Sequence, residues 1–343
     1  MALPPKHNLS PFLITGGNGF LASHIIDKIL ASEPNCTIHS LDINTRVMSL
    51  AQPVAIFHNA SPPTQSSDVP EPGPEVVYPL VLVTGAHNLL RAAAEVKTIK
   101  ALINTSTSGV ITDNVSDIIN CEEDEPILWG QDRPPGSPQR TYCLCKTEYE
   151  EEIRFANRKP EYGGLLTVSL RPGLVFGERD TGSLGKMISV ARQGKSRFQM
   201  GNGQNPYDFI YAGNLADAHL VSAWALLEAW GKEPPTDSTT RVDGEIFNVT
   251  NDDPWLLWDF QRAVSAAIGK PVRKENIIVI PLWVGLTIGL ISKWTAWFGS
   301  FLGGKQEASV TRAGRVLGYR AEVGMKEGIE RSVRWIMEQK DVK

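Results

Sequence analysis

Cysteine is scarce in this chain. Among its 343 residues there are four cysteines, Cys36, Cys121, Cys143 and Cys145. They are too few and too scattered for a disulfide framework or for a zinc site with four cysteine ligands. We therefore expect the protein to work in a reducing compartment such as the cytoplasm, and we expect no bound metal.

The chain also has no excess of basic residues. Lys and Arg total 34 against 38 Asp and Glu, so the formal net charge is -4. Proteins that bind nucleic acids usually carry a basic patch, and we therefore expect no nucleic-acid partner. The first eight residues are polar and contain prolines rather than a charged segment followed by an apolar one, so we expect no signal peptide.

The apolar stretch near the C-terminus is too short to span a membrane. In this stretch, Val279–Leu302, the uninterrupted apolar part covers 280–292, short of the roughly 20 residues that a spanning helix needs. Tryptophans in this stretch suit a peripheral contact of 280–302 with a membrane surface. The same side chains would also suit the wall of a hydrophobic pocket, and both interpretations stay open. The tryptophans are Trp283, Trp294 and Trp297.

Short apolar runs alternate with helical patterns through the first half of the chain. This alternation predicts an α/β fold in which a doubly wound, mostly parallel sheet of the Rossmann type has helices on both faces. The predicted strands are Phe12–Thr15, Thr37–Ile43, Val54–Asn59 and Leu102–Thr105. The predicted helices are Leu21–Leu30, Val83–Val96, Tyr142–Asn157, Asn214–Trp230 and Leu257–Ile268.

The first predicted strand runs into a glycine turn. Gly16, Gly19 and Ala22 follow one another at three-residue intervals, a spacing typical of dinucleotide-binding turns. Gly16 permits the tight turn, Gly19 allows the pyrophosphate to approach a helix N-terminus, and Ala22 is small enough for close helix packing. Asp42, at the end of the second strand, could accept hydrogen bonds from the adenosine ribose, which favours NAD. Arg46 nearby leaves NADP open.

Tyr142 and Lys146 lie four residues apart on a predicted helix, so both side chains leave the same face. A nearby ammonium group is expected to lower the pKa of the tyrosine and to suit it for proton transfer with a substrate hydroxyl. The strand before this helix ends in a hydroxyl cluster, Thr105 to Ser108, where open α/β sheets bind their ligands.

Several segments together give the chain a clear resemblance to the extended short-chain dehydrogenases. Within them it resembles the group of 3β-hydroxysteroid dehydrogenases and sterol-4α-carboxylate 3-dehydrogenases (decarboxylating). The resemblance covers nearly the whole chain. The matching segments are FLITGGNGFLASHI, FHNASPP, TSTSGV, YCLCK, LRPGLVFGERD, GNGQNPYDFIYAGNLADAHL, GEIFNVTNDDP and LGY.

This resemblance implies a role for individual residues. Tyr142 would be the catalytic acid or base, Lys146 would also hold the nicotinamide ribose, and Thr107 would occupy the position of the catalytic serine. His58 would pack at a strand end near the cofactor rather than bind a metal. The residues that the resemblance and the glycine turn place against the cofactor are Gly16, Gly19, Phe20, Leu21, Asp42, Ala60, Ser61, Tyr142, Lys146 and Pro172.

The resemblance also implies a substrate and a location. It suggests oxidation of the 3β-hydroxyl of a sterol, steroid or polycyclic terpenoid, with or without loss of a 4-carboxylate. An enzyme with such a substrate is expected on the cytoplasmic side of a membrane, for example that of the endoplasmic reticulum. The alternative enzymatic function is that of a reductase of non-sterol ketones or aldehydes, of the dihydroflavonol or cinnamoyl type. A homodimer is left open.

We predict two intertwined parts. Residues 1–176 would form the NAD(P)-binding domain and 177–343 the mainly substrate-binding part, with Asn205–Leu220 and Glu245–Asn251 returning to the sheet.

The connection between the second and third predicted strands is short. It has 11 residues, Ile43 to Pro53, where the family has a helix, a further strand and another helix. We therefore expect the sheet to lack an edge strand. The short connection also leaves open a hypothesis of a different kind, in which the protein is a catalytically impaired or truncated paralogue.

Overall fold

The computed structural model describes residues 10–42, 53–63, 69, 71–111, 118–123, 138–281, 284 and 306–341. Within these residues the largest unit is a six-stranded parallel sheet with the strand order β11-β6-β4-β3-β1-β2. Its strands are β1 (Phe12–Thr15), β2 (Ile38–Leu41), β3 (Ala55–His58), β4 (Ala101–Thr105), β6 (Leu166–Pro172) and β11 (Glu245–Val249).

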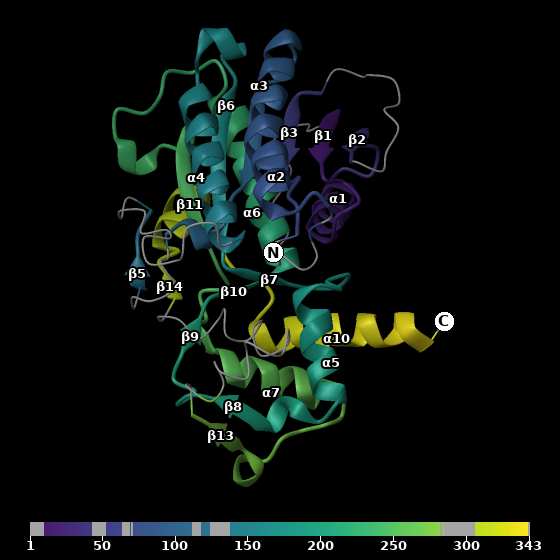
Figure 1. Ribbon diagram of the computed structural model, residues 1–343. Helices are drawn as coiled ribbons and strands as arrows, with labels where there is room; N and C mark the ends of the chain where they lie inside the picture. The colour runs from purple at the N-terminus through teal and green to yellow at the C-terminus, as the bar shows by residue number, and fades with distance from the viewer. Residues whose placement is uncertain are drawn as a thin grey trace.

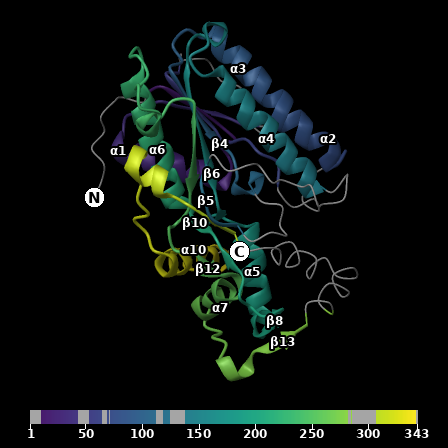
Figure 2. The same ribbon diagram turned by 90° about the vertical axis from the view of Figure 1, so that its left-hand side faces the viewer.

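Helices cover both faces of this sheet. Figure 2 shows α1 and α6 on one side of the strands and α2, α3 and α4 on the other. The helices of the first layer are α1 (Phe20–Ser32) and α6 (Ala212–Ala229). Those of the second are α2 (Pro74–Tyr78), α3 (Gly85–Glu95) and α4 (Pro138–Ala156), and a π-helical turn, Pro79–Thr84, joins α2 to α3. The predicted doubly wound α/β fold is confirmed.

Burial explains why these runs form a central parallel sheet. All residues of β3, β4 and β6 are buried, as expected for strands with helices packed on both faces. The chain passes from β1 outward to β2 and then returns to β3 on the other side of β1. Ligands of open α/β sheets bind at such a reversal, at the carboxyl ends of the strands. The fold therefore directs attention to the ends of β1, β3 and β4.

A smaller part lies beyond the carboxyl ends of the main strands (Figure 1). Its helices, α5 (Ser183–Arg192), α7 (Leu257–Ala267) and α10 (Met325–Asp341), enclose a second hydrophobic core. The rings of Phe209 and Phe260 stack in this core with centroids 4.1 Å apart. Its strands are β5 (Ile118–Cys121), β7 (Leu174–Phe176), β8 (Phe198–Met200), β9 (Pro206–Tyr207), β10 (Phe209–Tyr211), β12 (Trp255–Leu256), β13 (Ile278–Ile280) and β14 (Gln306–Ala308).

The two parts are interleaved along the chain. Although α6 and β11 follow the first segments of the smaller part, α6 packs on α1 and β11 pairs with β6 in the main sheet. An ion pair between Lys28 and Asp217, 2.7 Å long, joins α1 to α6. The division of the chain at residue 176 stays a prediction, because core elements of the sheet come from both sides of it.

The sheet ends at β2 on one side. Among the described residues, β2 pairs with β1 and has no partner strand on its outer side. This agrees with the expected lack of an edge strand, although residues 43–52 and therefore most of the short connection lie outside the described residues.

The second helical layer is longer than its apolar periodicity predicts. The pattern predicts a helix over Val83–Val96, whereas the helical stretch begins at Pro74 and includes the π-helical turn. By length and composition alone, this stretch, 74–95, is the one among the described residues able to cross a membrane. It packs against α4 in the structure.

Candidate active site

The glycine turn connects β1 to α1 as its spacing predicts. Gly16 has φ +67°, a conformation that favours glycine, and a Cβ there would lie 2.9 Å from the Cα of Ala60. The Gly19 N–H donates to the Gly16 carbonyl over 2.9 Å, and Gly19 is the N-cap of α1. The turn therefore brings the start of α1 against the end of β3, and a larger residue at position 16 would push them apart.

The first turn of α1 offers backbone donors to an anion. The amide groups of Phe20, Leu21 and Ala22 open the helix, where N–H groups lack carbonyl partners within the helix. Ala22 is fully buried in the main core, so its small side chain permits the close packing that the pattern requires.

A second glycine of this turn was not singled out from the sequence. Gly17 has no space for a Cβ, which would overlap the Ser40 side chain of β2. The doubled glycine in TGGNG could have indicated that two strands crowd this turn.

Asp42 lies beside the turn, directly after β2. Its carboxylate accepts a hydrogen bond from the Asn18 N–H over 3.1 Å. The Gly16 N–H donates to the Leu41 carbonyl over 2.8 Å, which fixes the end of β2 next to the glycines. A carboxylate at this place suits the ribose hydroxyls of an adenine nucleotide. Arg46, the residue that leaves NADP open, is outside the described residues.

Thr15 fastens the ends of β1 and β3 together. Its hydroxyl oxygen accepts hydrogen bonds from the N–H groups of Asn59 and Ala60, both 3.2 Å long, and lies 2.5 Å from His58 Nδ1. Burial, and to a smaller extent the charge of Lys146, lowers the pKa of His58 to about 3. His58 is therefore neutral and holds the strand ends rather than moving protons.

Helix α4 brings Tyr142 and Lys146 to the ends of β3 and β4. The Lys146 ammonium donates to the Thr105 carbonyl over 2.9 Å and lies 5.9 Å from the centroid of the Tyr142 ring. The Tyr142 hydroxyl is hydrogen-bonded to the Ser61 side chain. The ring of Tyr78 meets the Tyr142 ring edge-on with centroids 5.3 Å apart. The predicted pair and the predicted cofactor residue Ser61 are thus gathered at one place.

The electrostatics of this pair differ from the sequence-based expectation. Burial raises the pKa of Tyr142 well above its ordinary value, and the hydrogen bond with Ser61 offsets only part of this effect. The sequence predicts that the neighbouring Lys146 lowers the pKa of Tyr142, whereas in this structure the loss of solvation decides the direction of the shift. Burial also lowers the pKa of Lys146 itself to about 8, against the opposing charge of Glu150.

Thr107 follows β4 on the same side as α4. It caps a short 3₁₀ turn, Ser108–Val110, and its hydroxyl oxygen accepts the Gly109 N–H over 3.1 Å. A Cβ on Gly109 would be 3.5 Å from Cys143 Sγ, so this turn packs directly against α4. Because the oxygen acts as acceptor in the turn, the hydroxyl hydrogen can be donated to a substrate oxygen.

Pro172 ends β6, the next strand of the sheet. It pairs with Val249 of β11, and the following residue, Gly173, donates its N–H to the Val249 carbonyl over 3.2 Å. The backbone at Pro172 is thereby held at the same edge of the sheet as Thr107. The structure places the predicted residues of the glycine turn, β2, β3, β4, α4 and β6 along one edge.

The sequence model of the 3-beta hydroxysteroid dehydrogenase/isomerase family matches residues 67–282. The chain belongs to this family. The match covers α4 with Tyr142 and Lys146, together with Thr107 and Pro172.

Two yeast proteins match this chain along nearly its whole length. The chain is 30% identical to the sterol-4-alpha-carboxylate 3-dehydrogenase, decarboxylating, of Saccharomyces cerevisiae, over 95% of this chain and 97% of that protein. It is 31% identical to the enzyme of the same name from Candida albicans, over 97% and 99%. A solved structure of a dTDP-glucose 4,6-dehydratase double mutant from Streptomyces venezuelae, with NAD bound, shares the fold with a TM-score of 0.67. The identity is 19%, and 96% of this chain and 98% of that chain are covered.

One residue of the site, Glu150, is not predicted from the sequence. Glu150, one helical turn after Lys146, forms a buried ion pair with Arg171, the residue before Pro172. Its sequence signal is the spacing of four from Lys146, which puts both side chains on one helix face. The partner could not be named, because no local pattern connects 150 to 171.

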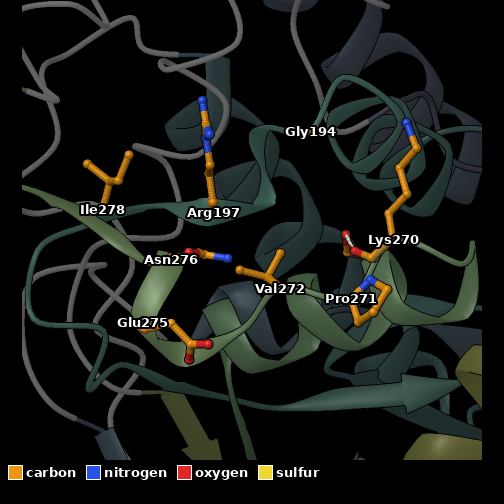
Figure 3. Close-up of a pocket in the computed structure, with 9 residues that line it drawn as sticks. Gly194, Arg197, Lys270, Pro271, Val272, Glu275, Asn276 and Ile278 are labelled. Atoms are coloured by element: carbon orange, nitrogen blue, oxygen red, sulfur yellow. Dashed lines mark hydrogen bonds between the residues drawn. The ribbon is translucent and has the colours of Figure 1, made fainter.

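Figure 3 shows a pocket in the smaller part of the protein. It has a volume of about 540 Å³ and is lined by Arg197, Lys270, Val272 and Asn276 among others. None of the residues expected in the active site lines it. Among the described residues, no group of three or more His, Cys, Asp or Glu side chains is placed to hold a metal ion.

Proposed function

We propose that the protein is an NAD-dependent dehydrogenase that oxidises the 3β-hydroxyl of a sterol bearing a 4α-carboxylate, with loss of that carboxylate as CO2. The observation that carries this proposal is the placement of the Tyr142 and Lys146 pair beside the glycine turn, at one edge of the sheet. The names of the two yeast relatives supply the substrate class and the decarboxylation.

The residues at the strand ends fit NAD. Gly16 and Gly19 leave room for a pyrophosphate at the start of α1, and Asp42 beside the turn suits the adenosine ribose. When bound there, the nicotinamide supplies a hydride acceptor. Lys146 would hold the nicotinamide ribose, and Ala60, Ser61 and Pro172 would line the cofactor.

The chain's own part in the chemistry is positioning and proton transfer. Thr107 would donate a hydrogen bond to the substrate oxygen at C3 and so fix the alcohol near Tyr142. Tyr142 would take the hydroxyl proton at its phenolic oxygen during oxidation and would return a proton during reduction. Because burial disfavours the phenolate, Lys146 must keep its positive charge while Tyr142 acts.

Decarboxylation needs little from the protein after this step. Oxidation at C3 beside a C4 carboxylate gives a β-keto acid. The C4–carboxylate bond breaks, its electron pair moves toward the C3 ketone, and CO2 leaves. A proton donor at the ketone oxygen favours this movement, and both Thr107 and the protonated Tyr142 are suited to that place.

The proposal is tested with purified protein, NAD and two 3β-hydroxysterols that differ only in a 4α-carboxylate. We expect NADH formation with the carboxylated sterol and release of CO2 together with it. Equal turnover of a dihydroflavonol or cinnamoyl aldehyde with reduced cofactor would favour the reductase reading. No turnover of any of these compounds, with NADH still bound, would favour a non-catalytic paralogue.

We also propose a peripheral contact with a membrane through residues 280–302, on the cytoplasmic side. Most of this stretch lies outside the described residues. The strand that leads into it, β13, exposes Ile278 and Val279 at 46% and 57% of their surface. Arg273 and Lys274 precede it at exposed positions and suit anionic headgroups. Sedimentation with anionic liposomes should weaken when Trp294 and Trp297 are replaced by Ser.

A homodimer is the last part of the proposal. Val76, Leu80 and Phe155 expose 45%, 59% and 59% of their surface on the layer formed by α2, the π-helical turn and α4. These exposed apolar side chains suit contact with a second copy of the chain along this layer. Light scattering during size-exclusion chromatography should give twice the mass of 37.6 kDa.

A further inference from the structure

A buried ion pair lies directly behind the catalytic residues. Glu150 of α4 and Arg171 of β6 are 0% and 1% exposed. Arg171 Nε donates to both carboxylate oxygens of Glu150 over 3.1 and 3.0 Å, and Nη2 donates to Oε1 over 2.5 Å. The guanidinium plane thus meets the carboxylate with two of its nitrogens, the most directional geometry available to such a pair.

The pair also holds residues Cys121 to Glu123 at the end of β5. Arg171 Nη1 donates to the Glu123 carbonyl over 3.2 Å, just after β5. The Glu123 side chain accepts the Asn248 N–H over 2.9 Å, and the Asn248 amide donates to the Cys121 carbonyl over 3.0 Å. The Arg171 guanidinium therefore joins α4 and the end of β6 to the residue after β5, and the Glu123 side chain extends this network to β11.

Glu150 is the acidic group that acts on Lys146 among the described residues. The other groups around Lys146 are the rings of Tyr142 and Tyr149 on its own helix, His58 from β3 and the Thr105 carbonyl from β4. His58 is neutral, and Arg171, which holds Glu150, is a cation. Burial works against the charge of Lys146 and the Glu150 carboxylate works for it.

Stability alone does not account for such a pair. Two charges taken out of water lose solvation, and apolar side chains of similar size often hold a fold equally well. The pair lies one helical turn from Lys146 and one residue from Pro172, so both of its ends lie next to groups that would hold the cofactor.

We propose that Glu150, fixed by Arg171, is a positioning residue that keeps Lys146 charged and aligned for the ribose and for Tyr142. This inference rests on the proposed function, since it assigns Lys146 to the cofactor. Glu150 acts through Lys146 and touches neither substrate nor cofactor.

The test compares Glu150→Gln with Glu151→Gln in the full chain. Glu151 is the next residue of α4 and is exposed, so its variant removes a negative charge that faces solvent rather than the buried one. NADH binding is followed by fluorescence from pH 6 to 10, and sterol oxidation is measured over the same range. We expect the pH above which NADH binding weakens to fall by about one unit in Glu150→Gln, because a neighbouring carboxylate favours the ammonium form. Glu151→Gln should bind NADH as the wild type does.

A second variant covers the case in which Glu150→Gln fails to fold because Arg171 is left unpaired. Glu150→Leu combined with Arg171→Met replaces both charges, and its folding is checked by circular dichroism. Its pH limit should also fall, but by less than in Glu150→Gln, because it removes the Arg171 cation together with the carboxylate. An unchanged pH limit in a folded variant would overturn the inference. If the wild type binds NADH but oxidises no sterol, the proposed substrate fails while a shifted binding limit still supports the role of Glu150. No NADH binding by the wild type would overturn both.

Discussion

The environments at the two ends of the main sheet have opposite effects on the charged forms of buried side chains. At the amino ends of β6 and β11, Asp243 accepts hydrogen bonds from Arg158, Asn157 and Arg241. Burial alone would raise the pKa of Asp243, but these hydrogen bonds outweigh it and lower the pKa to about 2. The hydrogen bonds with Asp243 also raise the pKa of Arg158. Both partners are thus stabilised in their charged forms.

The carboxyl ends show the reverse. Burial lowers the pKa of Lys146 to about 8 and that of His58 to about 3, and it raises the pKa of Tyr142. Each of these groups is pushed toward its neutral form. One helix, α4, spans the distance between the two ends, with Tyr142 near its start and Asn157 directly after its last residue. The charged groups at the amino ends of the strands therefore stabilise the fold. At the carboxyl ends, where the catalytic residues are proposed to lie, the charged forms are destabilised by burial.

The largest effect that would sharpen this comparison comes from Tyr142→Phe. Turnover should fall by about 10³-fold, because the variant removes the proton acceptor and little else. NADH affinity, measured by fluorescence titration, should stay within about twofold. Sterol oxidation within tenfold of the wild type would contradict the assignment of Tyr142 and would leave the carboxyl end without its proposed base.

Lys146→Met should abolish turnover and yet stabilise the fold. Since the folded pKa of about 8 lies below the usual lysine value, the cost of the buried ammonium is full below pH 8 and disappears above about pH 10.5. We expect a gain of about 2 kcal/mol at pH 7 that shrinks toward pH 10.5. Urea unfolding at both pH values measures this gain. A loss of stability at pH 7 would show that Lys146 supports the fold.

Asp243→Asn should have the opposite outcome at the other end. The carboxylate contributes stability above its unfolded pKa near 4, and this contribution is lost as the pH falls from about 4 to about 2. We expect a loss of about 2 kcal/mol at pH 7 and almost none near pH 2, with unchanged kcat for sterol oxidation. A lowered kcat at equal folded fraction would break the comparison.

Asp42→Ser is expected to give the smallest effect. The ratio of kcat/KM for NAD over that for NADP should fall by about tenfold, because the carboxylate no longer repels a 2′-phosphate. Steady-state kinetics with both cofactors gives this ratio. An unchanged preference would mean that Arg46 or another cation decides the choice.

The sequence predicts best what is local. The glycine turn, Asp42 and the pair Tyr142 and Lys146 each lie within a few residues of a strand end or on one helix, so local spacing and the family resemblance predict them. The α/β fold follows from the same kind of local pattern. Gly17 was missed because its constraint comes from Ser40 on the neighbouring strand.

What the sequence could not show depends on contacts between distant segments. The pairing of Glu150 with Arg171 requires α4 to lie against β6, and no periodicity encodes that register. The charge of a neighbouring residue predicts a lowered pKa for Tyr142, whereas its burial in the structure raises this pKa. The pattern predicts the helix 74–95 too short, because the π-helical turn Pro79–Thr84 departs from the 3.6-residue period of an α-helix.

The interleaving of the two parts has a consequence for synthesis on the ribosome. β11 ends at Val249, and α6 covers the sheet face opposite α4, so the nucleotide half lacks one strand and one helix until about three quarters of the chain has been made. A fragment ending at residue 176 would leave the apolar residues of β4 and β6 beneath α6 bare, among them Ile103 and Leu170. The nascent chain must therefore keep this surface from aggregating until α6 and β11 arrive.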